Sequence, residues 1–100
     1  MQVQISTEGL SVKKFMKDLK RTIRRGIRHK NLHYVIIDSE SYLDDNAITN
    51  IVEVTRRFRK RSKSKYIRIA IDYLRGRMHI FIDFTDNIRQ SESGIDFYVL

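Results

Sequence analysis

The sequence predicts a small α/β domain in which two amphipathic helices pack on a mixed β-sheet. The expected element order is β-α-β-α-β-β, with a further strand at the end of the chain. Two segments space their apolar residues as helices do, and several others show the alternating or continuous apolar pattern of strands. A short loop with a glycine joins two alternating segments, which indicates a β-hairpin. The chain has 100 residues, which is the length of a single domain spanning residues 1–100.

The first three elements are a strand, a helix and a second strand. Residues 2–6 alternate between polar and apolar side chains, as a short strand does. Residues 12–29 carry a single apolar stripe at helical spacing, and Ser11 precedes them as a helix N-cap. The stripe consists of Val12, Phe15, Met16, Leu19, Ile23 and Ile27. Residues 32–38 have apolar side chains at both odd and even positions, which is typical of a strand covered on both faces.

A second helix and a final strand complete the predicted set around the hairpin. The helix begins at Asp44 or Asp45, either of which can cap it, and ends near Arg61 or Ser62. Its apolar stripe consists of Ile48, Ile51, Val52, Thr55 and Phe58. Residues 95–100 are expected to form the last strand, after a polar loop.

The hairpin joins residues 66–74 and 77–85 through a two-residue loop, Arg75-Gly76. This loop fixes an apolar row in which Tyr73 faces Met78, Ile71 faces Ile80, Ile69 faces Ile82 and Ile67 faces Phe84. The opposite row pairs Asp72 with His79, Ala70 with Phe81 and Arg68 with Asp83. We expect the first row in the core and the charge pairs of the second row on an exposed surface.

Composition excludes several classes of function. The chain has no cysteine, so disulfides, thiolate zinc sites and cysteine nucleophiles are excluded. No apolar run approaches the ~18 residues of a membrane span, and no signal peptide precedes the first strand, so a cytoplasmic protein is expected. Twenty Lys and Arg against twelve Asp and Glu give a net charge of +8, which favours a polyanionic partner.

The basic residues gather in two segments, and these form the candidate nucleic-acid-binding site. Lys30 and Lys65 continue the two runs beyond this site, whereas residues 31–55 contain no Lys or Arg and form an acidic zone. The candidate residues are Lys13, Lys14, Lys17, Lys20, Arg21, Arg24, Arg25, Arg28, Arg56, Arg57, Arg59, Lys60, Arg61 and Lys63.

The first basic segment carries the stronger signal. Its helix stacks like charges at i,i+4 spacing, for example Lys17 with Arg21 and Arg24 with Arg28, and each such pair costs a few tenths of a kcal/mol. The alternative explanation is a solvated face whose cations pair with acids elsewhere in the fold, and the stacked like charges make it the less favoured of the two. The second segment closes a helix, where cations complement the helix dipole. The two segments form one surface only if both helices lie on the same face of the sheet, and the sequence leaves this open.

The expected function is non-catalytic binding to the phosphate backbone of nucleic acid, with little sequence specificity. Duplex DNA is expected as the ligand in preference to RNA. The basic faces hold almost no Asn or Gln for base edges and no aromatic side chain for stacking. A homodimer is also expected, because Tyr66, Ala70, Leu74 and Phe81 make the second face of the hairpin rather apolar. A helix covering that face is the alternative.

A metal-dependent nuclease is a third possibility. Asp38 ends a predicted strand and Glu40, Asp44 and Asp45 follow it, where α/β proteins often place metal ligands. The common nuclease pattern of an acid followed two residues later by a strand lysine is absent, and a helix cap explains the acids more simply. We therefore expect no catalytic residue, no metal, no cofactor and no small-molecule substrate.

Residues 34–70 resemble the core of a STAS domain: a strand ending in Ile37-Asp38-Ser39, an acidic loop, a helix and an apolar strand. The family's phosphorylatable Asp-Ser-Ser-Gly type of motif is replaced by Asp44-Asp45-Asn46-Ala47. The composition is similar to that of small uncharacterised proteins of thermophilic archaeal viruses, which implies the host cytoplasm as location. These resemblances imply a function that ranks second, before the nuclease. It is that of a protein-interaction or regulatory module whose basic face binds an acidic partner.

Overall fold

The fold is an α/β domain with the predicted order of elements. The computed structural model describes residues 2–29, 32–40, 43–61, 67–85 and 95–99. The elements are β1 (Gln2–Ser6), α1 (Val12–Arg28), β2 (Tyr34–Ser39), α2 (Asp45–Arg59), β3 (Ile67–Leu74), β4 (Arg77–Asp83) and β5 (Ile95–Val99).

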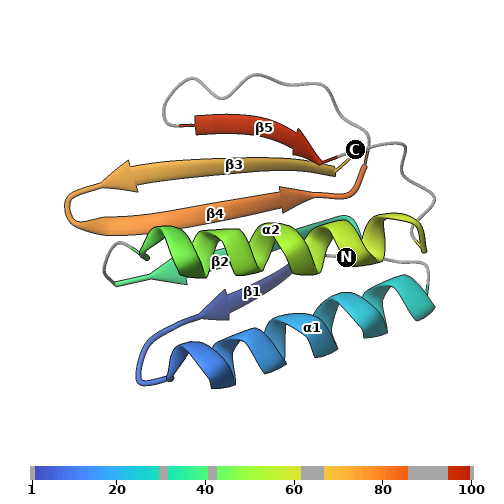
Figure 1. The fold of residues 1–100 in the computed structure, drawn as a ribbon, viewed down its shortest axis with the longest axis horizontal. Helices are drawn as coiled ribbons and strands as arrows, with labels where there is room; N and C mark the ends of the chain where they lie inside the picture. Colours follow the sequence, from blue (N-terminus) through green and yellow to red (C-terminus); the bar gives the residue numbers. More distant parts are fainter. Residues whose placement is uncertain (1, 30–31, 41–42, 62–66, 86–94, 100) are drawn as a thin grey trace.

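The strands form one mixed sheet with the order β1-β2-β4-β3-β5. β1 is parallel to β2, and every other neighbouring pair is antiparallel. The connections from β1 to β2 and from β2 to β3 both cross the sheet in the same direction. Because such crossovers are right-handed, both helices lie on one face of the sheet, side by side (Figure 1). The sequence left open whether the two basic segments share a face, and the helical parts of both, residues 13–28 and 56–59, lie on the same face of the sheet.

The helices begin at the predicted caps. The Ser11 side chain accepts a hydrogen bond from the Lys14 amide at 3.3 Å, and the Asp44 carboxylate accepts one from the Ala47 amide at 2.8 Å. α2 ends at Arg59, before the predicted end, and the amide of Arg61 then bonds the Phe58 carbonyl in a turn.

β2 begins at Tyr34 rather than at Leu32 as predicted. Leu32 is buried against the backbone of Gly26 in α1, where the absent side chain leaves room for it. The apolar character of residue 32 therefore reflects helix packing and not the sheet.

The core lies between the helices and the sheet. α1 buries Phe15, Leu19 and Ile23 of its predicted stripe, whereas Val12 is exposed. α2 buries Ile51 and Phe58 of its stripe, together with Val54, which the predicted stripe did not include. The sheet contributes Val35, Ile37, Ile67, Ile69, Ile71, Met78, Ile80 and Ile82. No helix in the described residues is long and apolar enough to cross a membrane.

The hairpin has the predicted register between Arg68 and Arg77, with Ile69 opposite Ile82 and Ile71 opposite Ile80. Arg75 and Gly76 both have positive φ angles, 52° and 78°, as a two-residue type I′ turn requires.

The expected exposure of the Arg68–Asp83 pair is wrong. Arg68 is 8% exposed and Asp83 is 1% exposed. The register places Tyr34 of β2 and Tyr98 of β5 on either side of this pair in the same row across the sheet. These neighbours belong to strands whose order the hairpin alone does not reveal.

Candidate nucleic-acid interface

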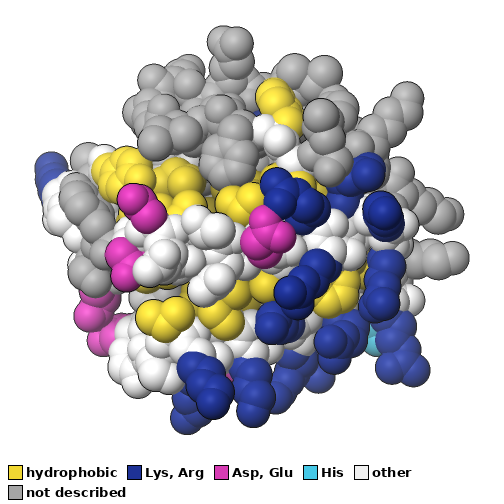
Figure 2. Space-filling model, viewed as in Figure 1, with side chains coloured by type: hydrophobic (Ala, Val, Ile, Leu, Met, Phe, Trp, Pro, Cys, Tyr) yellow, Lys and Arg dark blue, Asp and Glu magenta, His cyan; other side chains and the backbone are white. Residues whose placement is uncertain are grey.

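The basic side chains of α1 project away from the core. The buried stripe fixes one side of the helix, and of its Lys and Arg residues only Lys20 is half-buried while the others are exposed. Within the described residues, none of these cations takes part in an ion pair. Figure 2 shows their dark blue side chains along the lower edge of the molecule. The expected alternative, pairing with acids elsewhere in the fold, therefore does not account for this row.

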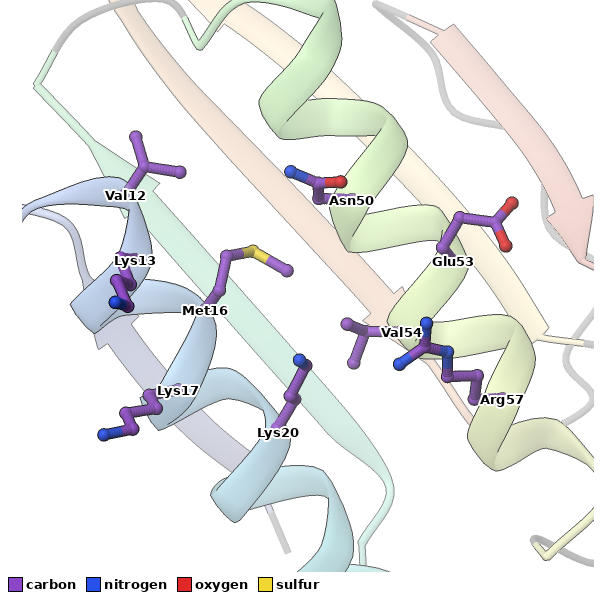
Figure 3. Close-up of a pocket in the computed structure, with 9 residues that line it drawn as sticks. All are labelled: Val12, Lys13, Met16, Lys17, Lys20, Asn50, Glu53, Val54 and Arg57. Atoms are coloured by element: carbon purple, nitrogen blue, oxygen red, sulfur yellow. The ribbon is translucent and has the colours of Figure 1, made fainter.

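The basic end of α2 lies next to the basic end of α1. Arg56 forms an ion pair with Glu53 one turn earlier on the same helix. Arg61 lies over the ring of Phe58, with its guanidinium carbon 5.8 Å from the ring centre. Arg57 points towards α1 (Figure 3). The candidate residue Lys63 lies outside the described residues.

A groove runs along the line where the two helices meet. Its larger hollow has a volume of about 560 Å³ and lies between the first part of α1 and the middle of α2 (Figure 3). A smaller hollow of about 150 Å³ follows towards the helix ends. The residues lining the two hollows are Val12, Lys13, Met16, Lys17, Lys20, Asn50, Glu53, Val54 and Arg57, then Arg24, Ile27, Arg28, Phe58 and Arg61.

The groove divides the candidate residues into two sets. Those that line it, here called the groove cations, are Lys13, Lys17, Lys20, Arg24, Arg28, Arg57 and Arg61. Those that do not line it, here called the outer cations, are Lys14, Arg21, Arg25, Arg56, Arg59 and Lys60. The structure thus places about half of the predicted site residues along the groove and the other described ones on the surface outside it.

Charge is separated along the helices. Asp44 and Asp45 stand at the start of α2, and the side of the molecule with the strand-to-helix loops also carries Glu8 and Glu40. Figure 2 shows most of the acidic side chains at the left and many of the basic ones at the right. A hydrogen bond to Glu8 and the charge of Glu8 raise the pKa of Glu40 above its ordinary value of 4.5.

Two of the four acids considered as metal ligands have partners in the fold. Asp38 pairs with Arg77 at 3.1 Å and with Nε2 of His79 at 3.1 Å. Asp44 caps α2. Within the described ranges, no three His, Asp or Glu side chains are placed to hold a metal ion.

The structure defines the class of protein as an α/β domain with a basic two-helix face. The chain matches no protein-family model, no curated protein and no solved structure.

Sequence reasoning did not find the groove, although a signal for it is present. The row Lys13, Lys17, Lys20, Arg24 and Arg28 follows the helical spacing of three and four, next to the apolar positions Met16 and Ile27. A row of residues directly beside the apolar stripe of a helix faces the element that packs next to that helix. That the neighbour is the second basic helix follows only from the strand order.

Proposed function

We propose that this protein binds the phosphate backbone of duplex nucleic acid through the face formed by α1 and α2, without catalysing a reaction and with little sequence preference. The observation that carries the proposal is the placement of both helices on one face of the sheet, which joins the two basic segments into one surface. The cations of α1 form no ion pair among the described residues, and such a row favours a polyanion as the ligand.

The aromatic side chains favour a duplex over a single strand. Phe15 and Phe58, the aromatic residues of the two helices, are 2% and 7% exposed. They cannot stack against free bases, which is the usual means of holding a single strand. In a duplex the bases stack on each other, so contacts to phosphates suffice. We propose duplex DNA as the first candidate ligand and the cytoplasm as the location of the protein.

An acidic protein partner is the second candidate, and the surface favours it less. A protein interface needs apolar anchors among its charges. Of the large hydrophobic side chains described on the two helices, Val12 alone is well exposed, at 51%.

A homodimer remains part of the proposal. Neither helix covers the second face of the sheet, so the helix cover considered from the sequence does not occur. That face carries the stacked rings of Tyr34 and Phe81 at 5.1 Å, and Tyr98 at 40% exposure. It also carries both signs of charge, as in the Arg77–Asp38 pair, so two copies can meet there without the repulsion that the helix face would impose.

Salt dependence tests the proposed function. With about six phosphate contacts, the logarithm of the association constant for a DNA duplex should fall with the logarithm of salt concentration at a slope near −5. Reversing the charge of Arg21, Arg24 and Arg28 together should weaken binding and leave the circular dichroism spectrum unchanged. An affinity that responds neither to salt nor to this variant would refute the proposal.

A further inference from the structure

We propose that one backbone strand of the duplex lies along the groove between α1 and α2, with its phosphates between the groove cations of the two helices. This inference rests on the proposed function and deepens it, because it names which part of the basic face receives the ligand. The outer cations then contribute long-range attraction without direct contact.

The first observation is that cations enter the groove from opposite walls. Figure 3 shows the amine of Lys20 and the guanidinium of Arg57 directed into the space between the helices. Like charges that face each other are repulsive, and an anion placed between them removes this repulsion. A phosphate also accepts hydrogen bonds from both groups at once.

The second observation concerns the acid that lines the same hollow. Glu53 belongs to the groove lining, but it pairs with Arg56 of its own helix, and its carboxylate is directed away from α1 (Figure 3). Among the described residues, no ion pair joins a groove cation to an acid. The positive charge of the groove cations is therefore not neutralised by an acid of the described residues, and an anionic ligand can pair with it.

The third observation is the shape of the lining. Among the apolar side chains of the lining, Met16, Val54 and Phe58 are 9%, 3% and 7% exposed. Val12, at one end of the groove, is 51% exposed, and Ile27 is half-buried. The cations continue from Lys13 to Arg28, a distance of about 22 Å at the helical rise of ~1.5 Å per residue.

Two double variants with the same change of charge test the inference. The groove variant is Lys20→Gln with Arg57→Gln, and the matched outer variant is Lys14→Gln with Arg25→Gln. Each removes one lysine and one arginine charge. Binding to a fluorescent duplex of twelve base pairs is measured by anisotropy at several salt concentrations, and thermal unfolding of each variant verifies the fold.

The groove variant should make the salt slope shallower by about 1.8, which is two contacts at ~0.9 each, while the outer variant changes it by less than half as much. The second hollow provides an independent pair, Arg24→Gln with Arg61→Gln, which should behave as the groove variant does. This pair decides the matter if Lys20→Gln with Arg57→Gln does not fold.

Equal effects of the groove and outer variants would overturn the groove as the track of the backbone, while the proposed function would stand. Binding of a single strand of the same sequence at least as tightly as the duplex would overturn the assignment of the ligand. A wild-type protein whose affinity is indifferent to salt would refute the proposed function itself, and the inference with it.

Discussion

Replacing Gly26 by alanine sets two effects of opposite sign against each other. Gly26 lies in the last turn of α1 without a positive φ angle, so its conformational freedom is a cost that alanine would remove. At an exposed helix interior this exchange stabilises by about 1 kcal/mol. At Gly26 the new methyl group must also fit against the buried side chain of Leu32.

The structure indicates that the steric effect is larger. A Cβ atom at residue 26 would lie 2.6 Å from the Cβ of Leu32 and 2.9 Å from its Cγ and Cδ2. Ordinary contacts between carbon atoms are about 3.5–4.0 Å. The closest atom is a Cβ, which cannot move without its backbone, so the cost should reach the upper part of the ~1–3 kcal/mol range for overpacking. We expect a net loss of about 1–2 kcal/mol in the free energy of unfolding.

Urea denaturation followed by circular dichroism measures this loss, with a fall in Tm of about 4–8 °C for each kcal/mol. Thr22→Ala in the same helix is the control, because it raises helix propensity and adds no atom. In the double variant with Leu32→Ala, the cost of Gly26→Ala should shrink, since the Cγ and Cδ2 contacts are gone. A Gly26→Ala protein at least as stable as the wild type would refute this reasoning.

Three further predictions concern the sheet and its loops. Asp83→Ala removes the carboxylate next to the buried Arg68 at 3.5 Å and should cost about 3–5 kcal/mol in denaturation, whereas a loss below ~1 kcal/mol would show that the pair is effectively exposed. Glu8 raises the pKa of Glu40 in the folded state, so protonation of Glu40 at low pH stabilises the fold. The stability of the wild type relative to the Glu8→Gln variant should therefore increase as the pH falls through this raised pKa towards 4.5. A stability difference that stays constant with pH contradicts this prediction. Light scattering should give twice the chain mass of 12.0 kDa, and Phe81→Glu should return the protein to monomer and weaken DNA binding; a wild-type mass near 12.0 kDa at micromolar concentration rules out the dimer.

The parts of the fold that depend on local chemistry could be predicted from the sequence. The Arg75-Gly76 loop adopts positive φ angles at both positions and so sets the register of β3 and β4. Ser11 and Asp44 cap the helices as their side-chain chemistry predicts. These features need only neighbouring residues, which the sequence displays directly.

The parts that depend on strand order could not be predicted. β3 lies on the side of β2 away from β1, with β4 between β2 and β3. The two crossovers therefore run in the same direction, which places α2 on the same face of the sheet as α1. The groove, the division of the cations and the row that places Tyr34, Asp83, Arg68 and Tyr98 side by side all follow from this arrangement. The candidate site was therefore predicted in its residues but not in its shape.

The separation of charge along the helices gives the molecule an electric dipole. The field of a polyanion exerts a torque on such a molecule, which turns the basic helix ends forward and the side with Glu8 and Asp45 away before contact. Fewer encounters then fail because of wrong orientation, so the association rate should be high at low ionic strength and fall steeply as salt screens the field beyond about 10 Å. Much of the salt dependence of binding should accordingly lie in the rate of capture.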